Sequence, residues 1–479
     1  MNLTQEQIVQ FKKAIDDKNY YFVYRLFIPQ FGKIVRSEDN KLLYVYNKCN
    51  YELLEESAIR DAMWEFLVKP EIDCPEKIRI RVLDEVVKII LDSPEYSKVK
   101  MDSYEDYLFF KNGALNFVTG EFITETSGLF NTSYINCDYK PETLECPYFD
   151  EFLGQIFLGD NEPDKNQINK EWMKLGYWLY PQHKMEKIFI YVGTSAANGK
   201  SVYFDFIASL FQKEFVSFTS LNAITKSNSL ERTSLINARL NIGQEFETDY
   251  LQSAELKKAI SGQELEINRK YLEPINISPQ FKILVALNKM PEFSDKTYAI
   301  TRRLDITEMN ARFVPLEEYQ KLKNPLIQKT FLMKEKKDIL ASFEEEKSAI
   351  ANKAIKALKE LRELKWQLPV SESNIEILEE FTASNSPIMA FLQERYEPCD
   401  ELIKQVGWER VLSDMTEAEI NVAGETLRQR QMKIAQEIKK AFNVKSKLVR
   451  NGGNVGRKYP LTIKPEYCEM MAQKSILDN

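Results

Sequence analysis

Three short apolar runs in the middle of the chain are separated by longer segments with helical periodicity. The runs cover residues 187–192, 238–243 and 281–287, and each has the length and composition of one buried strand. After the first run, apolar residues recur at the spacing of one helix face, as at Val202 and Phe206. Buried strands that alternate with helices predict an α/β core in this part of the chain.

The regions on either side of this core differ from it in their hydrophobic and charge patterns. Before it, helical and strand patterns alternate, and two short strands are predicted around the turn-forming Asn112-Gly113 pair. After it, charges of both signs follow one another in a helical pattern, which predicts a solvated arm or linker. The predicted segments are an accessory α+β domain (1–106), a β-rich and helical segment (107–186), the α/β core (187–315), the charged helical arm or linker (316–370) and a mainly helical C-terminal domain (371–479).

Length and composition exclude several classes of protein. A chain of 479 residues suits about three domains, and no apolar run reaches the roughly 18 residues of a membrane span. The first residues are polar and acidic, so we expect no secretory signal. The six cysteines form no Cys-x-x-Cys pair and His183 is the only histidine, which argues against a zinc site. We therefore expect a cytoplasmic protein that does not bind membranes.

Charge is distributed unevenly along the chain. The net charge is −7, but the segment from Arg428 to Lys464 holds eleven basic residues and one acid, Glu437. An acidic body with a basic C-terminal segment indicates a localised anionic partner. A helical pattern over residues 425–442 followed by a basic hairpin predicts a winged-helix DNA-binding unit; the alternative is a solvated tail or a ring-contact domain. The basic residues that we expect at DNA are Lys445, Lys447, Arg450, Arg457 and Lys458.

Small and turn-forming residues follow the first apolar run, and a helical pattern follows them. This context is typical of a loop that binds nucleotide phosphates with its backbone N–H groups. Lys200 would reach the β- and γ-phosphates, and the Ser201 hydroxyl would hold Mg²⁺. Five residues, rather than the usual four, separate Gly193 from Gly199, so a surface turn that carries Gly-Lys-Ser is the alternative. The predicted nucleotide-binding residues are Gly193, Asn198, Gly199, Lys200 and Ser201.

Polar residues also follow the second and third apolar runs. Glu245, with Glu247 as the alternative, is placed to orient the attacking water and to help hold Mg²⁺. Asn288 at the end of the third run can contact both the γ-phosphate and that water. Arg302 and Arg303 follow, and an arginine supplied to a neighbour's phosphate can raise turnover by about 10³ or more. A glutamate at a strand end is in other contexts an ordinary surface residue.

A hairpin is predicted between the second and third runs. Apolar residues alternate on both sides of Arg269-Lys270-Tyr271, which places a basic and aromatic sequence at the tip. Such a tip can bind the phosphate backbone of DNA. The alternative is an ordinary edge hairpin with solvated charges.

Taken together and in this order, these motifs resemble the superfamily-three replicative helicases, in the branch of poxvirus-type and phage primase-helicases. The resemblance covers about residues 107–313. It implies an AAA+-type core that assembles as a hexameric ring, with ATP and Mg²⁺ at Lys200 and Ser201. It further implies that Glu245 supports hydrolysis, Asn288 acts as sensor, and Arg303 or Arg302 acts on the neighbouring subunit. The matching segments are Asn198-Gly-Lys-Ser, Ala238-Arg-Leu to Glu245, Glu255-Leu-Lys257 to Arg269, Ala286-Leu-Asn288-Lys-Met-Pro291 and Arg302-Arg303-Leu304.

The function that this resemblance implies is that of an ATP-driven DNA helicase, with 3′-to-5′ polarity, in the replication of a phage, plasmid or mobile element. Its expected partners are single-stranded and forked DNA, origin duplex DNA, other copies of the chain, and a separate primase or initiator protein. Two alternatives stay open. One is an AAA+ ATPase that loads or remodels replication proteins without unwinding, and the other is a DNA-binding scaffold that does not hydrolyse ATP.

Overall fold

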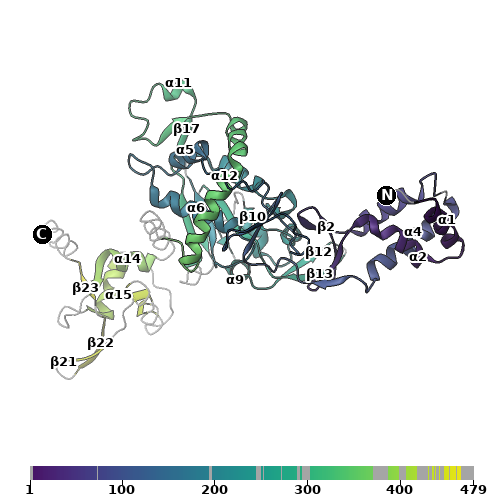
Figure 1. Ribbon diagram of the computed structural model, residues 1–479. Coiled ribbons are helices and arrows are strands. Elements are labelled where there is room, and N and C mark those ends of the chain that lie inside the picture. The colour runs from purple at the N-terminus through teal and green to yellow at the C-terminus, as the bar shows by residue number, and fades with distance from the viewer. Residues whose placement is uncertain are drawn as a thin grey trace.

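A computed structural model of the chain shows an N-terminal α+β domain, a central α/β domain and a smaller C-terminal unit (Figure 1). The residues that it describes are 4–72, 74–193, 197–243, 250–251, 253–270, 272–288, 292–293, 302–369, 387–398, 406–417, 430, 434–435, 437–438, 442, 447–451, 454–459 and 461–464.

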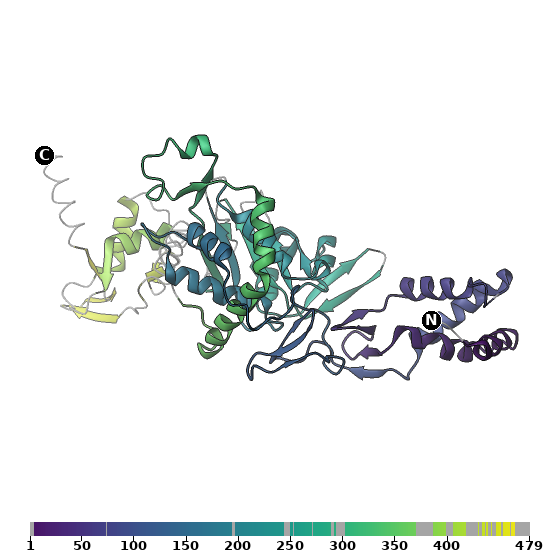
Figure 2. The same cartoon turned by 45° about the horizontal axis from the view of Figure 1, so that its top comes forward.

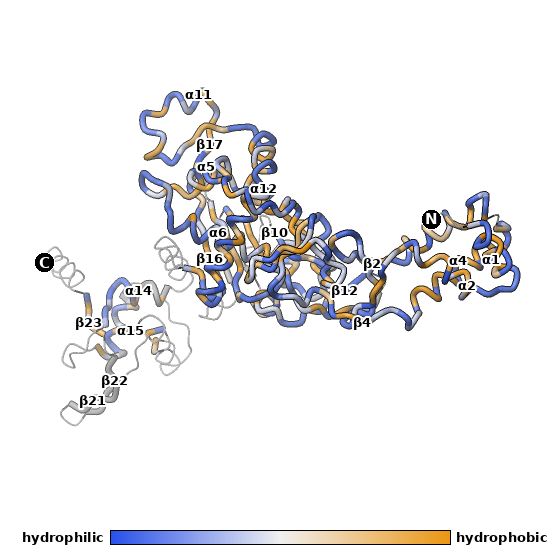
Figure 3. The backbone as a smooth tube through the Cα atoms, in the orientation of Figure 1, coloured by the Kyte–Doolittle hydropathy of each residue, from blue (hydrophilic) through white to orange (hydrophobic). Residues whose placement is uncertain are grey.

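The N-terminal domain packs four helices beside a four-stranded sheet with the order β3-β2-β1-β4. Its core is aromatic: the rings of Phe11 and Phe66 meet edge to face at 5.1 Å, and Phe27 packs against Phe66 at 5.4 Å. Figure 3 shows hydrophobic residues gathered between α1, α2 and α4. The elements are α1 (Gln5–Asp16), α2 (Tyr20–Phe27), η1 (Ile28–Phe31), β1 (Ile34–Ser37), β2 (Leu43–Asn47), β3 (Asn50–Leu53), α3 (Glu56–Leu67), α4 (Glu76–Asp92) and β4 (Ser97–Val99).

A three-stranded sheet, β5-β6-β7, and two helices follow. The predicted hairpin around Asn112-Gly113 is confirmed, because β5 and β6 pair as antiparallel strands on either side of it. The elements are β5 (Tyr107–Phe110), β6 (Gly113–Asn116), β7 (Phe122–Ile123), α5 (Pro147–Ile156) and α6 (Lys165–Leu179).

The central domain is built on a five-stranded sheet with the order β16-β8-β14-β10-β9, in which every neighbouring pair is parallel. The three apolar runs form β8, β10 and β14, the three inner strands, so the predicted α/β core is confirmed. The elements are β8 (Ile188–Val192), α7 (Lys200–Ser209), η2 (Lys213–Phe215), β9 (Val216–Ser217), α8 (Leu221–Thr225), η3 (Leu230–Leu235), β10 (Leu240–Gly243), β11 (Tyr250–Leu251), α9 (Ser253–Ile260), β12 (Leu265–Arg269), β13 (Leu272–Ile277), β14 (Lys282–Leu287), β15 (Glu292–Phe293) and β16 (Leu304–Glu308).

The path of the chain through this sheet reverses between β8 and β14. These two strands are neighbours, but the chain leaves β8 toward the β9 edge and leaves β14 toward the β16 edge. In open α/β sheets a crevice forms outside the carboxyl ends of the strands at such a switch point, and ligands bind there. The strand order alone therefore predicts a ligand site at the carboxyl ends of β8 and β14.

The segment after the core contains a long helix, α12 (Lys336–Glu363), preceded by β17 (Arg312–Val314), α11 (Leu316–Tyr319) and β18 (Thr330–Leu332). The expectation of a solvated arm does not describe α12. One face of it, including Phe343, Ile350 and Leu358, is buried in the same core as α6. The helices approach closely: a methyl group added at Gly176 of α6 would lie 2.3 Å from the Ala354 carbonyl oxygen.

The C-terminal unit contains the predicted basic hairpin. β21 and β22 pair as antiparallel strands, with Asn451 opposite Asn454 at the turn. Among the helices of the described residues, none is long and apolar enough to cross a membrane. The elements are α14 (Pro387–Arg395), β19 (Tyr396–Pro398), β20 (Val406–Gly407), α15 (Trp408–Glu417), β21 (Lys447–Asn451), β22 (Asn454–Tyr459) and β23 (Leu461–Ile463).

Candidate functional site

The side chain of Lys200 lies at the switch point between β8 and β14. Its Nζ donates to the carbonyl oxygens of Gly193 (3.0 Å) and Leu287 (2.8 Å) and to Oδ1 of Asn288 (2.9 Å). Gly193 directly follows β8, and Leu287 is the last residue of β14. Two residues predicted from separate motifs, Lys200 and Asn288, are thus brought into direct contact. Lys200 is 9% exposed, so its charge is held in a sheltered position.

The two glycines of the loop are required by their surroundings. A Cβ atom at Gly193 would lie 2.2 Å from the Asn198 side-chain nitrogen and 2.8 Å from the Met309 carbonyl oxygen. Gly199 has φ +87°, and a Cβ atom there would lie 2.9 Å from Ile156. The lengthened spacing between Gly193 and Gly199 therefore places a glycine at each position where a larger residue would clash or be strained.

Two further hydrogen bonds hold the loop, and one of them comes from a residue distant in the sequence. The Phe313 N–H donates to the Ala197 carbonyl oxygen at 2.8 Å, and the Lys200 N–H donates to Asn198 Oδ1 at 3.3 Å. Asn198 is buried, whereas Ser201, in the first turn of α7, is exposed. The hydroxyl that we predicted to bind Mg²⁺ is therefore open to solvent at the helix N-terminus.

Glu245 and its alternative Glu247 lie outside the described residues, which stop at Gly243 at the end of β10 and resume at Tyr250. β10 is the neighbour of β14 in the sheet. Among the residues that the structure describes, no three acidic, histidine or cysteine side chains group together in a way that could hold a metal ion. The predicted Mg²⁺ ligands in the described part of the chain are thus limited to Ser201.

The arginine pair lies at the opposite end of the sheet. The Ile188 N–H, at the start of β8, donates to the Arg303 carbonyl oxygen at 2.9 Å. Gly193, whose carbonyl holds Lys200, is five residues further along, which corresponds to about 16 Å at about 3.3 Å per strand residue. The fold therefore does not bring Arg302 or Arg303 to Lys200 of the same chain.

The predicted hairpin at 265–277 is confirmed as β12 and β13, with Leu265 opposite Ile277 and Arg269 opposite Leu272. It projects from the central domain on the side of the N-terminal domain (Figure 2). The Arg269 guanidinium folds back onto the Glu273 carbonyl oxygen, with bonds of 2.8 and 3.0 Å. Lys270 at the tip is exposed.

The sequence did not identify Arg232, the residue that anchors this hairpin to the central domain. Arg232 is fully buried, and its guanidinium donates to the carbonyl oxygens of Glu266 in β12 (3.1 Å) and Ala223 (3.3 Å). It also forms an ion pair with Glu255 of α9 at 2.9 Å. The hairpin root is thus tied to the central domain by a buried cation, and the tip projects beyond it.

The basic residues of the C-terminal unit are placed only in part. Lys447 is the register partner of Lys458, and Arg457 is the partner of Leu448. Arg450 pairs with Val455, whereas Lys445 lies outside the described residues. The hairpin thus carries basic residues on both strands, as predicted.

A buried charge cluster between α6 and the strands β8 and β16 was not predicted either. In α6, Lys170 Nζ lies 2.7 Å from Asp305 Oδ2, and Lys174 Nζ lies 2.7 Å from Asp305 Oδ1. Glu171 accepts hydrogen bonds from the hydroxyls of Tyr191 in β8 and Tyr203 in α7. Burial by itself would raise the pKa of Asp305, but the two ammonium groups outweigh it and lower the pKa to about 2.

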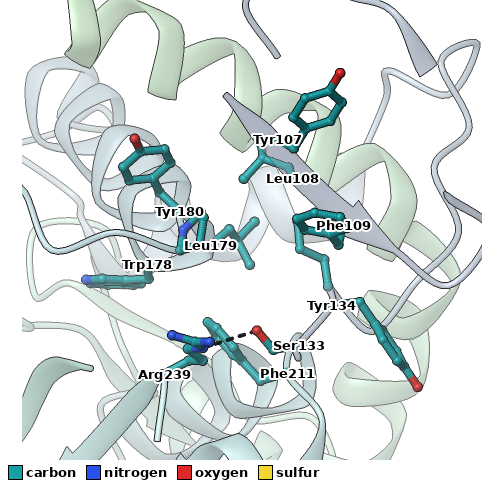
Figure 4. Close-up of a pocket in the computed structure, with 12 residues that line it drawn as sticks. Tyr107, Leu108, Phe109, Ser133, Tyr134, Trp178, Leu179, Tyr180, Phe211 and Arg239 are labelled. Atoms are coloured by element: carbon teal, nitrogen blue, oxygen red, sulfur yellow. Dashed lines mark hydrogen bonds between the residues drawn. The ribbon is translucent and has the colours of Figure 1, made fainter. Parts of the chain in front are cut away.

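A small cavity lies between β5 and the end of α6 (Figure 4). Tyr107, Phe109 and Phe211 line it, and Arg239 donates to Ser133 Oγ at its edge (3.2 Å). Its volume of about 30 Å³ leaves room for only a few water molecules, at about 10–15 Å³ for each. We therefore assign no substrate to it.

Two family models match the chain. "Family of unknown function (DUF5906)" matches residues 191–303, and "D5 N terminal like" matches residues 25–158. No curated protein matches. Among solved structures, an A-form apo structure of the NrS-1 C-terminal region is similar, with TM-score 0.49, 14% identity and 92% of this chain and 98% of that chain covered. Another apo structure of that region has TM-score 0.45, 16% identity and 92% and 99% covered.

The two matched ranges can be compared with the positions of the motifs described above. The first family model runs from β8 to Arg303 and so contains Lys200, Asn288 and the arginine pair. The second model begins at residue 25, whereas the resemblance seen in the motifs begins at about residue 107. The similarity to the D5-type family thus reaches back into the N-terminal domain, where the sequence offered no motif with chemistry of its own.

Proposed function

We propose that this chain is an ATP-driven DNA helicase that acts as a homo-hexameric ring in the replication of a phage, plasmid or mobile element. The observation that carries the proposal is the meeting of Lys200 and Asn288 at the switch point of a parallel sheet. The D5-like match over residues 25–158 supports the primase-helicase branch. The 3′-to-5′ polarity rests on the resemblance of the motifs.

The geometry fits a nucleotide at the loop. Lys200 already holds its ammonium among three oxygen atoms, and phosphate oxygens would replace part of that set. The Asn288 amide would then contact the γ-phosphate and the attacking water. Ser201 and the nucleotide's own phosphates would hold Mg²⁺, which supplies charge neutralisation during phosphoryl transfer. Glu245 would orient the water.

A ring is supported by the separation of Arg303 from Lys200. Because about 16 Å of strand lies between the arginine pair and the loop of the same chain, the pair can assist hydrolysis only at another copy's nucleotide. A second copy of this chain is therefore part of the proposed site. This arrangement is what the resemblance implied for the pair.

The DNA contacts are proposed at two places. Lys270 at the tip of the braced hairpin would contact single-stranded DNA in the ring's channel, with Arg269 beside it. The basic hairpin of β21 and β22 would bind duplex DNA at an origin or a fork. A separate primase or initiator protein completes the proposed set of partners.

The test is a paired assay of the full chain. ATP hydrolysis is measured with and without single-stranded DNA, and strand displacement is measured on forks with either a 3′ or a 5′ tail. We expect DNA-stimulated hydrolysis and displacement from the 3′ tail, both lost in Lys200→Ala. Hydrolysis without displacement would favour a loader or remodelling ATPase, and duplex binding without hydrolysis would favour a scaffold.

A further inference from the structure

The two neighbouring arginines have different surroundings. The Arg302 side chain is 51% exposed, whereas that of Arg303 is 10% exposed. Both guanidinium groups reach the same carboxylate oxygen of Glu186, at 3.3 Å for Arg302 and 2.9 Å for Arg303. The resemblance implied Arg303, with Arg302 as the alternative, as the arginine that acts on a neighbouring subunit, and the structure gives the two different surroundings.

Arg303 is tied to three separate segments. Its guanidinium donates to Glu186, in the loop before β8, and to Ser261 Oγ at 3.0 Å, directly after α9. Its carbonyl oxygen accepts from Ile188, the first residue of β8. To reach another subunit, this side chain would have to leave a buried position and its partners, which is costly for a charged group.

Arg302 is held more loosely. Its ion pair with Glu186 is longer, and both side chains are half exposed, so the pair affects an equilibrium by a factor of about 5 at most. Its backbone is fixed, however, because Lys187 Nζ donates to the Arg302 carbonyl oxygen at 2.7 Å. The side chain can therefore turn outward while its starting point stays in place.

We propose that Arg302 is the arginine that contacts the nucleotide of the neighbouring subunit, and that Arg303 is a positioning residue. Arg303 holds Glu186 and the residue after α9 in place, and it thereby fixes the backbone position from which the Arg302 side chain extends. Glu186 holds Arg302 until a neighbour's phosphates offer a stronger negative charge. This inference rests on the proposed function, because it needs a second copy and a bound nucleotide.

A double-mutant cycle tests the division of roles. Steady-state ATP hydrolysis by the full chain with single-stranded DNA is measured for Arg302→Ala, Arg303→Ala and the double variant. We expect Arg302→Ala to lower kcat by about 10³ with KM changed by less than about threefold, because the lost contact acts on transition-state charge. We expect Arg303→Ala to lower kcat by a smaller factor, and the double variant to match Arg302→Ala within about twofold.

Milder variants cover the case in which Arg303→Ala does not fold. Arg303→Lys should restore part of kcat because an ammonium can still bond Glu186. Ser261→Ala should lower kcat a few-fold in the wild-type background and leave it unchanged in the Arg302→Ala background. The matched control is Arg60→Ala, at a half-exposed arginine in α3 that pairs with Glu56 and Asp84 and lies far from Arg302 and Arg303 in the sequence.

Three results would overturn the inference. The first is that Arg303→Ala abolishes turnover while Arg302→Ala keeps kcat within about threefold of wild type. The second is a double variant whose loss equals the product of the single losses, since Arg303 would then not act through Arg302. The third is a wild-type chain that hydrolyses no ATP, which would overturn the proposed function as well. In the first two cases the proposed function stands.

Discussion

Lys174 Nζ lies 2.7 Å from Asp305 Oδ1, and the Lys174 side chain is fully buried. The pair joins α6 to β16, the strand that begins directly after Arg303. Lys174 also donates to Thr307 Oγ1 at 2.6 Å and lies 3.2 Å from Glu171. Through Glu171, which accepts from Tyr191 and Tyr203, the cluster reaches the strand and the helix on either side of the loop. One buried group of charges therefore joins α6 to β8 and α7, which flank the loop, and to β16, which follows the arginine pair.

Lys174→Met should destabilise the central domain by about 3–5 kcal/mol, because it leaves the carboxylate of Asp305 without one of its buried cations. Thermal unfolding followed by circular dichroism measures the effect. The matched control is Lys336→Met, which removes the half-exposed ion pair with Asp205 and should cost no more than about 1 kcal/mol. Equal shifts of the two melting temperatures would contradict the importance of this cluster.

His183 should make the stability of the central domain depend on pH. Burial, and to a lesser degree the ammonium of Lys282, lower the pKa of His183 to about 4, below its usual value of 6.5. The unfolded chain then binds a proton at higher pH than the folded chain, so stability is complete above about pH 6.5 and is lost as pH falls toward 4.

The corresponding measurement compares wild type with His183→Gln. Between pH 7 and pH 4.5, wild type should lose about 2 kcal/mol more of unfolding free energy than the variant, because the variant lacks this proton uptake. Since His183 is the only histidine, no other imidazole contributes to the difference. Parallel stability curves for the two proteins would show that the imidazole titrates normally in the fold.

Gly193→Ala should abolish nucleotide binding. The added methyl group would meet the side chain of Asn198 and the carbonyl of Met309, so the loop that surrounds Lys200 would have to move. Gly128→Ala is the matched control, because a Cβ atom there meets nothing within 4 Å. Binding of a fluorescent ATP analogue is the readout. If both variants bind it as wild type does, Gly193 is not the first glycine of a phosphate loop.

Lys270→Ala should weaken the binding of single-stranded DNA more than Arg269→Ala does. The Lys270 side chain is exposed at the tip, whereas Arg269 is half-buried and lies one residue further from the tip. Fluorescence anisotropy at two salt concentrations measures the change, and loss of one phosphate contact should make the salt slope shallower by about 0.7. An unchanged slope in the double variant would place the DNA elsewhere.

The sequence predicted those parts of the fold in which local pattern and burial agree. The runs that form β8, β10 and β14 are mostly apolar because both faces of these strands are covered. The hairpins at 265–277 and 447–459 were predicted from alternation and turn residues. Lys200 and Asn288 were predicted from the order of the motifs. The fold brings their side chains into contact, although the two residues are far apart in the sequence.

The rest was missed where charges are buried. Asp305 and Thr307 in β16 are buried polar residues, so the sequence of this strand lacks the continuous apolar run that predicts a core strand. The burial of α6 is missed for the same reason, because Lys170 and Lys174 are charged and their common partner Asp305 lies more than a hundred residues away. The different surroundings of Arg302 and Arg303 depend on Glu186 and Ser261, which no local pattern connects to them.

The position of the arginine pair at the far end of the sheet from Lys200 has a consequence for how activity depends on dilution. On the proposed function, one chain carries halves of two different catalytic centres and no complete one. Turnover per chain is then not a fixed property of the molecule but rises with the degree of assembly, so the rate should follow concentration with an order above one until assembly is complete. Cells could thus hold dispersed copies at low abundance without consuming ATP, and hydrolysis would begin where copies gather on DNA.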